Sequence, residues 1–422
     1  MPQLVVSGPR PYGDGAHSDH STKVVPLPGV TQNYSELVKG SAQERGADKI
    51  ARLAGQTHDL VIFWQEVTEV LSSTVPYYWT PCWYTLDPAS LLITSHFHDG
   101  MAEFPEAWLA NEYYGDDVNK LTDVARSETG IATLHDLTNG DPSGTQRWQQ
   151  NMQMGGDQEL IASLRTRSGD VWGALGLYRE SGRPFFDEGE KAFLRAVSPN
   201  LAEGARRALL LGEATEPEWP DAPGLLVLNE RWEVESTTPG VEHWLAELPD
   251  GDWARGRLPA AVQAVAGRAL RTSEDPSQPG EIAVSRVLSR GGTWVVLHGT
   301  CLVGQPVRRV AVIVEPAHPA RIYPLLMSAY GLTEREKDVT RLVLQGSSTA
   351  QIAHELVVSL HTVQQHLKSI LDKTGVRSRR ELVGKVFFAH YEPRFRDNER
   401  RTAGQQPLRG GPLATGRCLP DT

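Results

Sequence analysis

The chain has few cysteines and no long apolar run. Its three cysteines, Cys82, Cys301 and Cys418, are odd in number and far apart, which argues against a disulfide framework and fits a reducing compartment. No stretch approaches the roughly 20 consecutive apolar residues that a membrane span needs. The amino-terminal residues lack a basic region followed by an apolar core, so we find no export signal. We therefore expect a cytoplasmic protein without a membrane partner.

Catalytic signatures are also missing. The sequence contains no G-x-x-x-x-G-K-[ST] loop, no G-x-S-x-G elbow, no H-E-x-x-H and no C-x-x-C. His96 and His98 alternate on one face of an expected strand and have a spacing that permits chelation, but a third and a fourth ligand are not evident. We predict that the chain is not an enzyme and holds no metal and no cofactor.

At a rough 150 residues per domain, 422 residues indicate two or three domains with cores of their own. The first forty residues show no sustained apolar period, and proline-rich stretches at Glu213–Pro223 and Pro316–Pro324 are typical of linkers. The resulting division is a disordered tail at 1–40, domains at 45–212, 224–315 and 325–391, and a flexible basic tail at 393–422.

The pattern at 45–212 predicts an α+β domain. An amphipathic helix is expected over Ala47–Val70, and a helix that opens at Asp187, with Glu190 as its reciprocal cap, should be kinked or restarted by Pro199. The expected strands are Cys82–Leu86, Leu91–Phe97, Leu160–Arg165 and Val171–Arg179. This order is typical of a sensor domain. The segment Trp172–Tyr178, followed by Phe185 and a long helix, resembles a GAF domain.

The pattern at 224–315 predicts a second, smaller α+β domain. Thr238 is the expected cap of a helix that has Pro239 at its first position, and Leu258–Arg271 predicts a second helix. The expected strands are Leu225–Leu228, Trp232–Glu235, Ile282–Leu288, Thr293–His298 and Arg308–Val314. The arrangement resembles the PAS fold.

Aromatic side chains of the first domain have two alternative roles. Sensor domains bind ligands between their sheet and helices, so a small-molecule effector in the amino-terminal half is one expectation. Core packing is the other. The residues concerned are Trp83, Tyr84, Trp172 and Tyr178.

Positive charge gathers near the carboxyl end of an otherwise acidic chain. The formal net charge is −10, whereas Gly331–His390 contains nine basic and six acidic residues. A basic module on an acidic body points to a nucleic-acid partner for that module.

The same module predicts consecutive short helices. Thr333 is a natural cap for a helix with an acidic first turn, and Gly346 should end that helix in a left-handed cap. A second helix is expected over Thr349–Leu356. Ser359 then caps a third helix that reaches about Lys373.

The third helix is amphipathic in a way that indicates function. Its apolar stripe, Val363, Leu367, Ile370 and Leu371, should pack on the first two helices. The opposite flank presents His361, Gln364, Gln365 and Lys368. A helix that follows a short turn and exposes such a flank can enter the major groove of DNA, where glutamine pairs with adenine edges and lysine reaches guanine or phosphate. Phosphate contacts are expected from Thr362, Lys373, Arg377, Arg379 and Arg380.

These residues form a dense motif over about sixty positions. It contains Leu332-Thr333-x-Arg335-Glu336, Gln351-Ile352-Ala353, Ser359-x-x-Thr362-Val363, His366-Leu367, Ile370-Leu371-x-Lys373 and Ser378-Arg379. The motif resembles the helix-turn-helix of LuxR-type transcriptional regulators.

The resemblance implies a fold and partners for the chain. It implies a four-helix domain whose fourth helix dimerises, for which we expect Leu382 and Val383, and base contacts at Gln364, Gln365 and Lys368. Gln364 stands where the family usually has lysine, which shifts the expected preference toward A·T pairs. The fold class we expect is two α+β sensor-like domains, GAF-like and PAS-like, followed by an all-α helix-turn-helix domain.

The implied function is a sequence-specific, DNA-binding transcription regulator. Its implied partners are double-stranded DNA, the transcription machinery and a second copy of the chain. The alternative is a signal-binding or protein-interaction module whose helical domain only dimerises.

Overall fold

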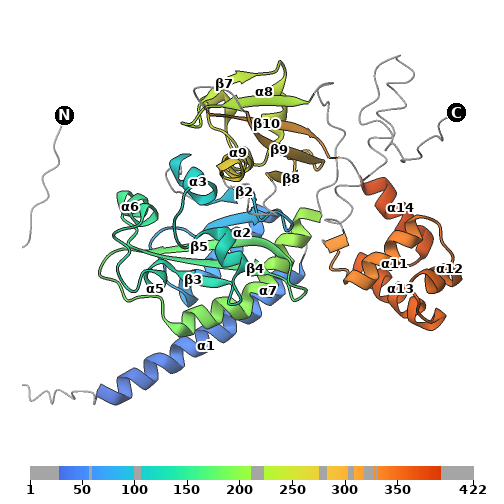
Figure 1. Ribbon diagram of the computed structural model, residues 1–422. Helices are drawn as coiled ribbons and strands as arrows, with labels where there is room; N and C mark the ends of the chain where they lie inside the picture. Colours follow the sequence, from blue (N-terminus) through green and yellow to red (C-terminus); the bar gives the residue numbers. More distant parts are fainter. Residues whose placement is uncertain are drawn as a thin grey trace, which may run out of the picture.

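The computed structural model describes residues 28–56, 59–98, 106–210, 223–274, 283–302, 308–317, 327–328 and 330–390. Two α+β domains, each with one antiparallel sheet, precede an all-helical domain (Figure 1). The prediction of this fold class is confirmed. The expected tail at 393–422, residues 1–27 of the other tail and most of both proline-rich linkers lie outside the described residues.

The first domain is built on a five-stranded antiparallel sheet in the order β2-β1-β5-β4-β3. The strands are β1 (Cys82–Leu86), β2 (Ile93–Phe97), β3 (Ile131–Thr133), β4 (Gln158–Arg165) and β5 (Val171–Arg179). Helices α2 (Leu60–Thr74) and α7 (Glu188–Leu210) pack on one sheet face, and α1 (Pro28–Gly55) packs on these two helices. The shorter helices are α3 (Glu106–Tyr113), α4 (Leu121–Arg126), α5 (Leu134–Leu137) and α6 (Gln146–Gln153).

The side chains of the sheet alternate between two cores, as the two-residue period of a strand requires. Trp83, Leu175 and Leu177 pack with α1, α2 and α7. Tyr84 and Ala174, their neighbours in the chain, belong to the core on the opposite face. Both faces of this sheet are therefore covered.

The single helix predicted over Ala47–Val70 is wrong. The structure has two helices there, and Asp59 caps the second by accepting a hydrogen bond from the Val61 amide at 2.9 Å. The disordered tail predicted at 1–40 is also wrong for residues 28–40, which belong to α1. Proline is well tolerated at a first helical position, as Pro28 is here. The carboxyl-terminal part of α1 is held by tertiary packing, with Ile50 fully buried.

Of the two outcomes expected at Pro199, a kink or a restart of the helix, the restart is wrong. Helix α7 continues through Pro199 to Leu210. The Ser198 hydroxyl donates to the Ser163 carbonyl at 2.7 Å and accepts from the Arg165 amide at 2.9 Å, which fixes this turn of the helix against β4. Buried residues after the proline, such as Leu201, stabilise the second half.

The second domain has a five-stranded antiparallel sheet in the order β7-β6-β10-β9-β8. The strands are β6 (Gly224–Leu228), β7 (Val234–Thr237), β8 (Val284–Leu288), β9 (Trp294–Leu302) and β10 (Arg309–Pro316). Its helical elements are α8 (Val241–Glu247), the 3-10 turn η1 (Trp253–Arg255) and α9 (Ala260–Glu274). Numbered within each domain, the two sheets share one strand order, 2-1-5-4-3.

Two local predictions in the second domain are wrong. Gly240, with φ of 82°, precedes α8 in place of Thr238, whose hydroxyl instead accepts from the Leu225 amide at 2.9 Å. Trp232 has φ of 66° and lies in the turn between strands, so the strand begins only at Val234. In both places the helix or strand begins two residues later than the pattern predicts.

The two α+β domains contact each other directly (Figure 1). The buried carboxylate of Asp87 accepts hydrogen bonds from the Arg286 backbone and guanidinium. His96 donates its amide to Asp250 at 3.0 Å. Helices α3 and α9 also pack together, and a side chain at Gly267 would meet the Cβ of Tyr113 at 3.0 Å. The absence of a side chain at Gly267 therefore allows this close approach.

The third domain consists of α11 (Glu334–Leu344), α12 (Thr349–Glu355), α13 (Leu360–Thr374) and α14 (Arg379–His390). Its core contains Val339, Ile352, Val363 and Ile370. Within the described residues, no helix of the chain is long and apolar enough to cross a bilayer.

Candidate nucleic-acid interface

Local capping defines the start of each of the first three helices in this domain. Thr333 and Glu336 form a reciprocal capping box at α11, and Ser348 and Gln351 form another at α12. The Ser359 hydroxyl accepts from the Thr362 amide at 3.0 Å and caps α13. The caps predicted at Thr333 and Ser359 are confirmed.

The carboxylate of Glu336 joins α11 to α13. This buried group accepts hydrogen bonds from the Ser369 hydroxyl and the Lys373 ammonium, both at 2.6 Å, and from the Thr333 amide at 2.7 Å. Burial raises the pKa of Glu336, but these donors outweigh it and hold the pKa below its ordinary value. The carboxyl-terminal half of α13 is therefore fixed on α11 by a charged contact as well as by apolar packing.

The opposite flank of α13 faces solvent. His361, Gln364, Gln365 and Lys368 are all exposed, whereas Val363 is fully buried. The imidazole of His361 lies 3.0 Å from the side-chain nitrogen of Gln365, one helical turn away. The structure thus brings the four residues predicted to read bases onto one accessible surface, which we call the α13 flank.

The residues predicted to contact phosphate are in different environments. Arg377 and Arg380 are exposed, and Thr362 is half-buried with its hydroxyl 2.8 Å from that of Ser359. Lys373 is paired with Glu336, and Arg379 donates to the Ser347 carbonyl. Phosphate contact stays a prediction for Arg377, Arg380 and Thr362, whereas Lys373 and Arg379 have intramolecular partners.

The fourth helix gives a mixed result for dimerisation. Leu382 is fully buried in the core of its own domain. A side chain in that position has no surface to offer a second copy, so the prediction for Leu382 is wrong. Val383, next to it, is exposed and stays a prediction.

The four aromatic residues that had two candidate roles are buried, and Trp172 lies in a cluster with Trp294 of the second domain and Met327. Trp83 stacks on Trp64 with ring centroids 4.4 Å apart, and Tyr84 stacks on Trp108 at 5.7 Å. Tyr178 is also fully buried. Core packing is therefore the role that their contacts support.

Glu336 was missed as a site residue by sequence reasoning. Its position three residues after Thr333 is the signal of a capping box. Its contact with Lys373, thirty-seven positions later, has no local signal.

Two short helices joined by a tight turn, the second with a polar exposed flank, define the helix-turn-helix class of DNA-binding domain. Residues 331–386 match the family described as bacterial regulatory proteins, luxR family. The spore germination protein GerE of Bacillus subtilis is 40% identical over 52 residues, which cover 12% of this chain and 70% of that protein. The chain belongs to the luxR family of bacterial regulatory proteins.

Two other relatives match over similarly short stretches. The monoamine regulon transcriptional regulator of Klebsiella aerogenes is 41% identical over 56 residues, 13% of this chain and 25% of that protein. The transcriptional regulatory protein DesR of Bacillus subtilis is 38% identical over 65 residues, 15% of this chain and 33% of that protein. The chain therefore spans between a quarter and a third of the length of these two relatives.

Proposed function

We propose that this chain is a sequence-specific DNA-binding transcription regulator that reads its operator with the α13 flank. The exposed polar flank of α13 is the observation that supports this most directly. Helix α13 is held at both ends, by the Ser359 cap and by the Glu336 contact. A side chain on a fixed helix meets base edges without a large cost in ordering.

A homodimer would present two such helices to successive major grooves, about 34 Å apart along B-DNA. Val383 on α14 is exposed and available for this contact. The two-fold symmetry of a dimer predicts an operator with two related half-sites.

The amino-terminal domains would act as sensors that restrain the third domain. The guanidinium of Arg206 on α7 donates to the Ser328 carbonyl at 3.4 Å, and Lys337 on α11 donates to the Ser328 hydroxyl at 2.8 Å. Met327, next to Ser328, is fully buried. This contact gives a signal in the first domain a physical route to the DNA-binding domain. A signal that favours one arrangement of the domains would change DNA affinity by population shift.

Selection of bound sites from random duplexes with the full chain tests the proposal. Gln364→Ala should lower affinity for the selected site by about tenfold, because a bidentate glutamine–adenine pair is worth about 1–3 kcal/mol. Gln345→Ala, an exposed glutamine at the end of α11, is the matched control and should leave affinity unchanged.

Two results would reject the proposal. One is failure to enrich any sequence at low salt. The other is binding that Gln364→Ala and Gln365→Ala both leave intact, which would favour a helical domain that only dimerises.

A further inference from the structure

A cleft of about 610 Å³ lies where the first domain meets the second. Its walls come from the end of α3, the segment 116–120, helix α4 with Arg126, residues 144–146 at the start of α6, and helix α9 of the second domain. This volume is in the range of small-molecule sites. The wall is mostly polar, and Tyr113 and Val118 are its main apolar members.

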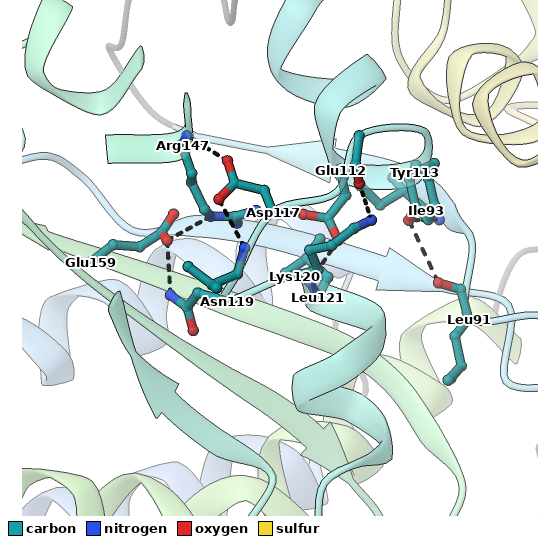
Figure 2. A network of polar contacts seen from close by, with 12 residues as sticks. Leu91, Ile93, Glu112, Tyr113, Asp117, Asn119, Lys120, Leu121, Arg147 and Glu159 are labelled. Carbon is teal, nitrogen blue, oxygen red and sulfur yellow. Dashed lines mark hydrogen bonds and ion pairs between the residues drawn. The ribbon is translucent and has the colours of Figure 1, made fainter. Parts of the chain in front are cut away.

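The inner wall is fixed by a buried ion network around Arg147. The Arg147 guanidinium donates to Glu159 at 2.6 Å and to Glu112 at 2.8 Å, and all three side chains are at most 1% exposed (Figure 2). Asn119 donates to the same Glu159 oxygen at 2.8 Å. Such a network is rigid, because every displacement would separate buried charges.

Two of the carboxylates in the cleft are directed into this network. The second oxygen of Glu112 accepts from the Leu121 amide at 2.6 Å. Asp117 accepts from the Arg147 amide at 2.6 Å and from the Val118 amide at 2.8 Å (Figure 2). Both acids therefore accept hydrogen bonds from the inner wall of the cleft, although the charge of Glu112 also acts on Lys120.

Positive groups from both domains converge on one carbonyl. Lys120 of the first domain donates to the Gly115 oxygen at 2.6 Å, and Arg271 of α9 donates to that oxygen at 3.4 Å. Arg268, one turn earlier on α9, also lines the cleft. Burial lowers the pKa of Lys120; the charges of Glu112 and Asp123 oppose this shift, and the positive charges of Arg271 and Arg268 add to it. An anion bound between Lys120 and Arg271 would reduce the electrostatic repulsion between these two side chains.

The acid that pairs with Arg271 is easily displaced. Asp116 accepts from the Arg271 guanidinium at 2.8 Å, but its side chain is 93% exposed. Exposed ion pairs contribute little, since water and salt screen them. Asp123, the fourth acid of the cleft, is also exposed.

We propose that this cleft binds the anionic group, a carboxylate or a phosphate, of a small effector, held by Lys120 from one domain and by Arg271 from the other. The inference rests on the proposed function as a regulator with sensor domains. A ligand that contacts both domains favours the arrangement in which α9 stays against α3, because it binds that arrangement more tightly.

Isothermal titration of the full chain with inorganic phosphate, and separately with succinate, tests the site and tells the two anion classes apart. At least one anion should bind at millimolar concentration or better. Arg271→Gln keeps a hydrogen-bonding side chain but removes the charge, and should weaken binding at least tenfold. Arg231→Gln, an exposed arginine of the second domain outside the cleft, should bind like the unaltered chain.

Lys120→Gln is the second variant, with circular dichroism to confirm that it folds. It should also lose affinity at least tenfold. Absence of heat with both anions, or affinities of Arg271→Gln and of folded Lys120→Gln within twofold of the unaltered chain, would overturn the inference. DNA binding measured on the same samples tests the two proposals separately. If DNA binding is intact and no anion binds, the anion site is rejected and the proposed DNA-binding function is retained.

Discussion

The charge of Glu336 is stabilised by three donors from two helices. Lys373 was expected to contact DNA phosphate. Because it donates to Glu336 instead, it stabilises the domain. Lys368, one turn earlier on α13, remains exposed. Two lysines five positions apart on one helix thus have different roles, because only one has a buried carboxylate within reach.

Replacing Glu336 with Gln should destabilise the third domain by about 1.5–3 kcal/mol at pH 7, the usual worth of hydrogen bonds to a charged group. The folded pKa of Glu336 is lowered. Its stabilisation is therefore present above the unfolded pKa of about 4.3 and is lost as the pH falls toward the folded pKa. Urea unfolding of both chains should show a difference at pH 7 that shrinks below pH 4.

Glu334→Gln on the same helix is the control for this experiment. Its side chain is 87% exposed and pairs only with Lys337 among the ion pairs of the described residues, so we expect a change below about 0.5 kcal/mol. An equal loss in both variants would show that the buried position of Glu336 has no special effect.

Replacing Lys368 with Ala distinguishes two kinds of DNA contact. If the ammonium reads a base edge, as its place on the α13 flank predicts, discrimination at one base pair should relax by about 1–3 kcal/mol. If it meets phosphate, affinity should fall for all sequences and the salt slope should decrease by about 1. Fluorescence anisotropy over a salt series, with selected and substituted duplexes, separates these outcomes; an unchanged affinity and slope would exclude both.

At the scale of elements, local chemistry explains what could be predicted from the sequence. Caps at Thr333 and Ser359 act within one helical turn, so the pattern locates them. The continuity of α7 through Pro199 depends on packing between distant segments, which the pattern does not contain. The buried position of Leu382 has the same cause, because one apolar residue on a helix fits a domain core and a dimer contact equally well.

Arg147 joins helix α6 to α3 and β4 through its ion pairs with Glu112 and Glu159. Changing Arg147 to Met should destabilise the chain by about 3–5 kcal/mol, since it leaves Glu112 and Glu159 buried without their cation. Burial already raises the pKa of Glu112 against the opposing charge of Arg147, and without that charge the pKa would rise further. The variant should therefore gain stability as the pH falls from 7 to 5, because protonation removes the buried charge.

Urea unfolding followed by tryptophan fluorescence at pH 7 and pH 5 measures this loss. Arg183→Met is the control, because this arginine is 65% exposed and pairs with Glu180 on the surface. A loss under 1 kcal/mol for Arg147→Met would mean that the network does not hold α6.

At the scale of the whole molecule, polar contacts between distant segments accompany the apolar packing of α3 and β2 on the second domain. The pairs Asp87–Arg286 and His96–Asp250 join the two α+β domains, and Arg206 reaches Ser328 beside the third. The arrangement of the domains thus depends on polar and apolar contacts between segments far apart in the sequence. None of these could be inferred from the pattern of one element.

If the contact at Ser328 restrains the third domain, Arg206→Gln should raise the DNA affinity of the effector-free chain several-fold. The neighbouring variant Arg207→Gln should not, because Arg207 is half exposed and bonds Glu203 and the end of α1. Anisotropy titrations with the selected operator measure both variants. If Arg206→Gln binds the operator no more tightly than the unaltered chain, the contact at Ser328 does not restrain the third domain.

In the second domain the first and last strands are neighbours, and Gly224 lies opposite Val314. The polypeptide thus enters and leaves that unit at one place, and α7 touches Ser328 without the unit in between. A chain in which the second domain is deleted, with residue 223 joined to residue 317, would therefore keep the direct contact between the first domain and the segment beside the third.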